Sequence, residues 1–147
     1  MRRFAFYFFL LALAANCVAR EENVAELKAR LEHARTQDRP QICVRIARLQ
    51  MQAADKLYTE GHADDARAAV EEVATYLEQA RDAAIGNKSH LKNVEIDARK
   101  ISERLRDIKR TLAFEDQAPV DQVIHRIEDV RTSLLNAMFA DKKKGQK

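Results

Sequence analysis

The residues whose spacing comes closest to a metal site lie near the C-terminus. Asp121, His125 and Asp129 fall at positions i, i+4 and i+8, with Glu128 beside them. On a helix this spacing lines three side chains along one face, where they could hold a metal ion weakly. The competing interpretation is a solvated helix face with ordinary charge pairs. It is favoured because none of the four histidines stands in a His-Glu-x-x-His or Glu-x-x-His motif. The sequence therefore predicts no metal site and no cofactor, with Asp121, His125 and Asp129 as weak candidates.

Nucleophilic and phosphate-binding chemistry lack the residues they need. The chain has three serines, and none stands in a Gly-x-Ser-x-Gly motif. Its three glycines are far apart, so they cannot form a loop that cradles a phosphate. We expect no catalytic residues and no enzymatic activity.

The two cysteines have different predicted roles. Cys43 is flanked by Ile42 and Val44, which favours a buried structural thiol over an intermolecular disulfide. Cys17 follows an apolar run near the N-terminus, where it could be the lipid-modified first residue of a bacterial lipoprotein. The preceding Ala14-Ala15-Asn16 fits that motif poorly, so lipidation is the minor alternative.

The N-terminus has the composition of a secretory signal peptide. Arg2 and Arg3 precede the apolar run from Phe4 to Ala15, and small residues follow it up to Ala19. We expect cleavage after Ala19 and a secreted or periplasmic protein. An uncleaved membrane anchor is less favoured, because residues 4–19 would span only about 24 Å as a helix.

The basic residues give weak support for nucleic-acid binding. The net charge of +3 comes from the two ends of the chain, and residues 20–140 have a net charge of −2. Lys92, Arg99 and Arg106 recur every seven residues and could meet phosphates or an anionic surface. No aromatic residues are interleaved with them to stack on bases, so a solvated face or pairing with another helix is favoured.

Apolar spacing predicts an all-α protein. Residues 89–112 place an apolar side chain at alternating steps of three and four, which is the seam of a helix packed against other helices. Similar seams predict helices over 21–34, 40–60 and 63–85, and another that has Pro119 in its first turn. Short connections between them favour an antiparallel up-down bundle of four main helices plus a shorter N-terminal helix. We expect one domain over residues 20–140 and a basic disordered tail over 141–147.

Several residues are predicted to start or end these helices. Asp38 and Pro40 suit the start of the second helix, and Gly61 suits its end. Gly86 is predicted to end the third helix, with Asn87 or Ser89 capping the fourth. Residues 115–119 are predicted to form a turn. The pattern leaves open whether residues 35–39 form a loop or a kink.

Charge predicts one helix pairing. Residues 88–112 carry a net charge of +4, and residues 63–84 carry −4. Adjacent antiparallel helices of opposite charge are most simply interpreted as complementary flanks.

The segment Leu57-Tyr58-x-x-Gly61-x-x-x-x-Ala66 resembles the middle of a tetratricopeptide repeat. In that family a helix ends there, a glycine turns the chain and a small residue packs the next helix. Glu78 stands where the repeat usually has proline, and no second unit follows at the repeat length of roughly 34 residues. We therefore interpret the segment as an ordinary helical hairpin with similar turn chemistry.

These observations favour a non-enzymatic secreted or periplasmic helical bundle. We expect it to bind another protein, or a second copy of itself, through its helix faces, or to have a structural role. One alternative is a ligand- or metal-binding bundle that uses Asp121, His125 and Asp129. Another is an envelope protein anchored through a lipid on Cys17. No nucleic-acid partner is expected, and membrane contact requires a retained signal segment or a lipidated Cys17.

Overall fold

The computed structural model describes residues 23–144 and, within them, the side chains up to residue 140. It contains five helices and no strand in that range: α1 (Val24–Glu32), α2 (Arg39–Thr59), α3 (Ala63–Asn87), α4 (Leu91–Thr111) and α5 (Phe114–Lys144). The predicted all-α bundle of four main helices plus a shorter N-terminal helix is therefore confirmed. The predicted signal peptide, its cleavage site and Cys17 lie outside the described residues.

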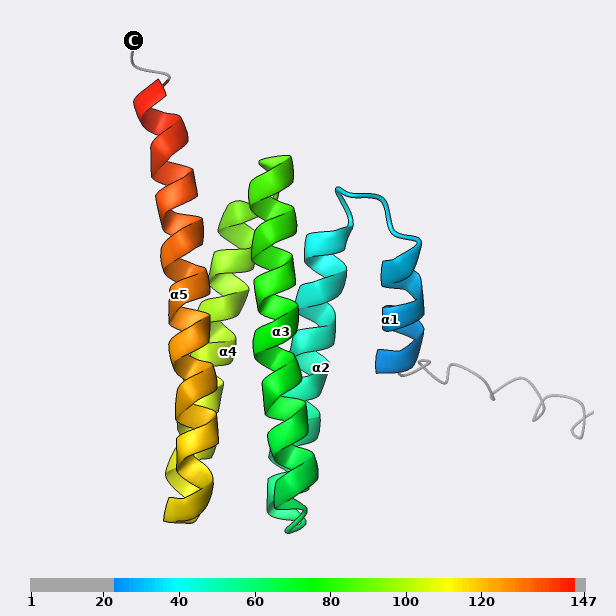
Figure 1. The fold of residues 1–147 in the computed structure, drawn as a ribbon, viewed down its shortest axis with the longest axis vertical. Coiled ribbons are helices and arrows are strands. Elements are labelled where there is room, and N and C mark those ends of the chain that lie inside the picture. The colour runs from blue at the N-terminus through cyan, green and yellow to red at the C-terminus, as the bar shows by residue number, and fades with distance from the viewer. Residues whose placement is uncertain (1–22, 145–147) are drawn as a thin grey trace, which may run out of the picture.

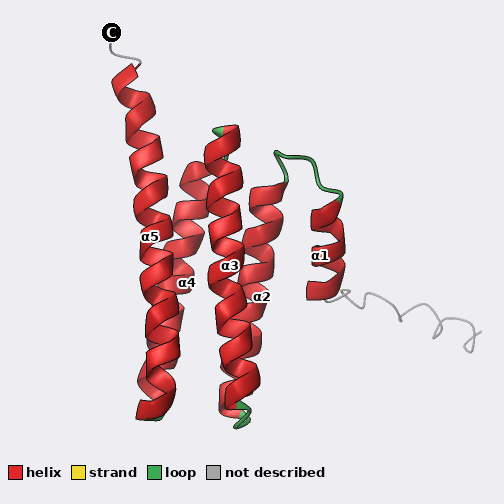
Figure 2. Ribbon diagram, viewed as in Figure 1, coloured by secondary structure: helices red, strands yellow, loops and turns green. Residues whose placement is uncertain are grey.

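The four main helices form two antiparallel hairpins that lie side by side (Figure 1). In one hairpin α2 packs on α3, and in the other α4 packs on α5. Where the hairpins meet, the first helix of one contacts the first helix of the other, and the second contacts the second. As a result α2 runs parallel to α4 and α3 runs parallel to α5. The short helix α1 packs on the outer side of α2. Figure 2 shows that the connections are short, so nearly all the described chain is helix.

The hydrophobic core is continuous through both hairpins. The six buried apolar residues of α5 that run from Val120 to Leu134 each lie 50 residues after a buried apolar residue of α3. Leu77 and Ile127 are one such pair, and both are completely buried. The two helices therefore present the same pattern of buried positions to the core. This shared pattern fits their parallel arrangement.

The connection before α2 is a loop and not a kink. Residues 33–38 separate α1 from α2, and the Nη1 of Arg39 donates a hydrogen bond to the carbonyl oxygen of Leu31 across this loop. Asp38 stands at the N-cap of α2 as predicted, but its side chain makes no capping hydrogen bond. Gly61 ends α2 as predicted, because it takes the left-handed conformation with φ of 82°.

The turn between α3 and α4 differs from the prediction. Gly86 does not end α3; the helix continues to Asn87, and Lys88 takes the left-handed conformation instead, with φ of 49°. The amide of Ser89 donates to the carbonyl of Ala84, and this bond closes the helix end without a glycine. The capping position of α4 belongs to His90 and not to Asn87 or Ser89.

The predicted turn over residues 115–119 is also wrong, because those residues already belong to α5. The turn lies at residues 112–113, where Leu112 is extended. Glu115 and Asp116 stand in the first turn of α5, where the helix dipole favours acidic side chains. Pro119 lacks only the amide that would bond to the carbonyl of Glu115, so the helix passes through it with the loss of one hydrogen bond.

The predicted charge pairing between α3 and α4 is not observed. In the described part of the chain no ion pair joins these two helices. The acidic residues of α3 instead pair with α1 through Lys28 and with α5 through Arg126. The reason is geometric: α3 packs on α5 more extensively than on α4, and complementary net charge does not determine which faces meet.

The C-terminal end of the described chain is helical. Helix α5 extends to Lys144, so the predicted start of the basic tail at residue 141 falls inside a helix, and residues 145–147 lie outside the described range. None of the helices within residues 23–144 is both long and apolar enough to cross a membrane.

Candidate functional site: a groove between α2 and α4

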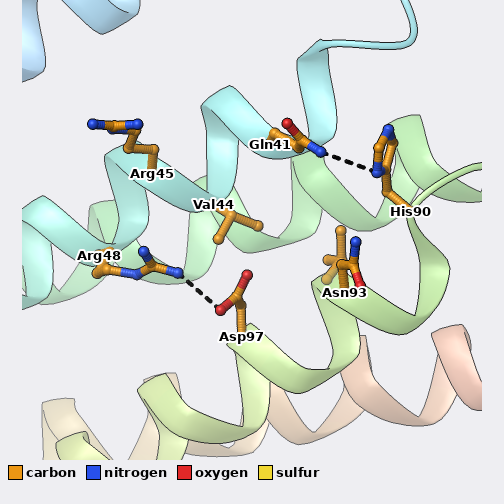
Figure 3. A pocket seen from close by; sticks show the side chains of 8 residues that line it. Gln41, Val44, Arg45, Arg48, His90, Asn93 and Asp97 are labelled. Carbon is orange, nitrogen blue, oxygen red and sulfur yellow. Dashed lines mark hydrogen bonds and ion pairs between the residues drawn. The ribbon is translucent and has the colours of Figure 1, made fainter.

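Three polar contacts join α2 to α4 at regular intervals. The amide nitrogen of Gln41 is hydrogen-bonded to Nδ1 of His90 at 3.1 Å (Figure 3). Arg48 Nη2 pairs with Asp97 Oδ1 at 2.8 Å, as Figure 3 also shows. One step further along, a third pair joins the two helices at 2.6 Å, between Arg104 Nη2 and Asp55 Oδ2.

We call these contacts the first, second and third bridges. Every bridge joins residues that are 49 apart in sequence, and successive bridges are seven residues apart on each helix. The regular spacing follows from two parallel helices in constant register, because seven residues make about two helical turns. The charged bridges lie at the surface. Arg48 is half exposed, and so is Arg104.

The bridges separate two hollows along a groove between the helices. The first hollow, between the first and second bridges, has a volume of about 270 Å³ and a buried floor that includes Val44 and Val94. The second hollow lies beyond the second bridge, has a volume of about 340 Å³, and is lined by Met51 and Ile101 among others. We call the two hollows and the three bridges the α2–α4 groove. It combines an apolar floor with a polar rim.

The rim of this groove has more basic than acidic side chains. Around the two hollows, the basic side chains of Arg48 and Lys100 accompany a single acidic residue, Asp97. Arg48 is already paired with Asp97, and Lys100 is exposed with no ion pair in the described chain. The groove therefore favours a negatively charged ligand.

The groove ends at the turn between α3 and α4. His90 has φ of 61°, so two non-glycine residues in this short turn are left-handed. The turn is held in place by Asn87, whose side-chain nitrogen donates to the carbonyl of Thr36 in the loop before α2. A further hollow of about 600 Å³ lies between this loop and the turn, with His90 at the boundary to the groove. The first bridge therefore lies next to a turn that is hydrogen-bonded to the loop before α2.

The metal candidates do not come together as a site. Asp121 pairs with Lys109 of α4, and this hydrogen bond lowers the pKa of the Asp121 carboxyl. Its other oxygen lies 3.7 Å from Nε2 of His125. No cluster of three or more histidine, cysteine, aspartate or glutamate side chains with metal-binding geometry occurs in the described residues. Asp129 therefore does not complete a metal site with Asp121 and His125.

Cys43 is buried and has no disulfide partner in the described residues. Only 1% of its surface is exposed, and burial raises the pKa of its thiol to about 11, with Arg39 acting weakly in the opposite direction. These observations agree with the structural interpretation and leave the intermolecular disulfide without an accessible thiol.

The predicted basic stripe does not act as a unit. Arg106 pairs with Glu128 of α5, so this residue serves the α4–α5 contact. Lys92 and Arg99 are exposed, and neither forms an ion pair within residues 23–144. The three residues therefore have different environments despite their regular spacing.

Sequence reasoning missed the α2–α4 groove, although a signal for it was present. Residues 41, 48 and 55 are polar at heptad spacing, and so are residues 90, 97 and 104. The two sets contain opposite charges at matching steps. A search for such pairs at a constant separation of seven heptads would have predicted that the two helices run parallel and side by side.

Comparison of the chain with protein-family models, curated proteins and solved structures finds no match.

Proposed function

We propose that this protein is a non-enzymatic binding protein that takes a segment of another polypeptide into the α2–α4 groove. The proposal depends on one observation. The α2–α4 groove has two hollows with apolar floors, and exposed polar bridges border them. An apolar floor supplies affinity and a polar rim supplies orientation, which is the usual composition of a recognition site. The predicted signal peptide favours a secreted or periplasmic location for this binding.

The bridges can be exchanged at low cost. Exposed ion pairs contribute only about 0–1 kcal/mol each, so a partner that replaces one member of a pair loses little. The apolar floor is shaped by residues that also belong to the core, such as Val44 and Val94. The groove is therefore largely preformed, which reduces the entropy lost on binding.

A selection from a random peptide library displayed on phage tests the proposal for partner segments of any sequence. We expect selected peptides to bind the purified protein and to lose about tenfold or more in affinity for the Asn93→Trp variant, since Asn93 lines the first hollow. The matched control is Lys92→Trp, because Lys92 is also exposed but does not line the groove. Peptides that are insensitive to Asn93→Trp, or a selection that yields none, would contradict the proposal.

A further inference from the structure

From the spacing of the second and third bridges we infer that the groove accepts an extended polypeptide segment with two acidic side chains three residues apart. This inference rests on the proposed function and specifies the partner's chemistry. The basic members of the second and third bridges, Arg48 and Arg104, stand one heptad step apart along the groove. With a rise of 1.5 Å per residue, such a step measures about 10.5 Å.

An extended chain matches this distance with three residues. In the polyproline II conformation the rise is about 3.1 Å per residue, and three residues make one turn. Side chains at i and i+3 therefore point the same way and stand about 9.3 Å apart, close to the spacing of the bridges. In a flat β-strand the same two side chains would point to opposite faces, so that conformation fits less well.

The size of the hollows also favours an extended segment over a helix. The hollows have volumes of about 270 and 340 Å³, and the second bridge separates them. A helix with its side chains is about 10–12 Å across and would require the bridges to open along the whole groove. Single apolar side chains can enter the hollows from above, between acidic side chains that meet the bridges.

The charges specify the acidic positions. Arg48 comes from α2 and Arg104 from α4, so carboxylates at successive steps would meet basic residues on alternate walls. Lys100 stands between them on α4 and lines the second hollow. A partner carboxylate can share these basic residues with Asp97 and Asp55 or replace those two in the pairs.

Synthetic peptides test this spacing directly. The probe is a fluorescein-labelled repeat of Glu-Pro-Leu, in which proline favours polyproline II and leucine is available for the hollows. Control peptides carry the same number of Glu residues as the Glu-Pro-Leu repeat but place them two or four residues apart, and a further peptide with the same number of Glu residues places them every seven residues on a designed helix. In anisotropy titrations at about 0.05 M salt, where charge attraction is little screened, we expect the three-residue repeat to bind about tenfold tighter than each of the others.

Matched variants locate the binding. Lys100→Glu should weaken the three-residue repeat about fivefold or more, because it reverses a charge in the groove. Arg99→Glu makes the same change on the adjacent residue, which does not line the groove, and should have an effect of less than about twofold. Equal affinity for the three spacings, tighter binding of the helical peptide, or equal effects of the two variants would overturn the inference.

The outcomes also separate this inference from the proposed function. If peptides selected from the library depend on Asn93 while the Glu-Pro-Leu repeat does not bind, the groove binds polypeptides but the acidic spacing is wrong. If neither kind of peptide binds, both proposals fail.

Discussion

The two hairpins meet along two contacts of opposite character. Between α3 and α5 the contact is extensive, and Arg126 reaches across it to pair with both oxygens of Glu78 and with Glu71. Between α2 and α4 the contact is sparse, and single polar bridges hold it at seven-residue intervals. The difference indicates that the α3–α5 contact contributes more to the fold than the α2–α4 contact, which leaves exposed the groove where we propose that a partner binds.

A second polar cluster lies within one hairpin, between α4 and α5. Ser102 of α4 is completely buried and donates a hydrogen bond to Glu128 of α5, which also pairs with Arg106 and Arg131. Arg131 continues the cluster to Glu95. A buried hydroxyl needs such a partner, and a satisfied polar group inside the core restricts how the two helices can pack. The α4–α5 register is therefore specified by polar as well as apolar contacts.

The largest expected difference between the two contacts concerns apolar truncation. Ile127→Ala should reduce the free energy of unfolding by about 2–5 kcal/mol, because it leaves a cavity at a completely buried position. Met51→Ala, at the half-buried wall of the groove, should cost less than about 1.5 kcal/mol, since only part of the side chain is removed from packing. Urea unfolding followed by circular dichroism measures both, and equal losses would contradict the division of roles.

Removing ion pairs should also reduce the free energy of unfolding more at the α3–α5 contact than at the α2–α4 contact, but by smaller amounts than apolar truncation. Arg126→Ala leaves two carboxylates of α3 without their partner, so we expect a loss of about 1–2 kcal/mol. Arg48→Ala breaks one exposed pair in the groove and should cost less than about 0.5 kcal/mol. The same unfolding assay decides the question. A larger loss for Arg48→Ala than for Arg126→Ala would mean that the groove contact holds the hairpins together.

Acid should weaken the contact between α4 and α5 through Glu128. Burial alone would raise the pKa of its carboxyl, but the hydrogen bond from Ser102 and the charges of Arg131 and Arg106 outweigh burial and lower it below the usual 4.5. Because the pKa is lower in the folded state, this contribution to stability is present above about pH 4.5 and is lost as the pH falls through the folded-state value.

The variant Glu128→Gln tests this dependence. We expect it to lower the urea midpoint at pH 7, and we expect this deficit to shrink as the pH falls through the folded-state pKa of Glu128, because the wild-type carboxyl then becomes protonated. Glu103→Gln is the matched control, since Glu103 is exposed on α4 and has no ion pair in the described chain. A deficit for Glu128→Gln that persists unchanged in acid would assign the effect to packing and not to charge.

Sequence patterns predicted the helices better than their arrangement. Apolar periodicity placed all five within a few residues, because each helix buries a single face. The predicted end of α3 was wrong because Gly86 does not stop the helix, which continues to Asn87 and is closed by the left-handed Lys88. The start of α5 was wrong because a proline six residues into a helix removes only one bond. The groove was missed because helix faces were assessed singly, and its polar residues become a site only when α2 and α4 are placed together.

The smallest expected effect concerns the third bridge, and it limits how the groove can work. A double-mutant cycle with Asp55→Ala and Arg104→Ala should give a coupling energy of about 0.2–1 kcal/mol, falling further in about 0.5 M salt as exposed charges are screened. A coupling this small means that a partner carboxylate can take over Arg104 with little loss to the fold. A coupling above about 2 kcal/mol would mean that the bridge is part of the scaffold, because displacing it would then cost more than one partner contact returns. In that case binding would have to leave the third bridge intact, with the partner carboxylate sharing Arg104 with Asp55 and not replacing it.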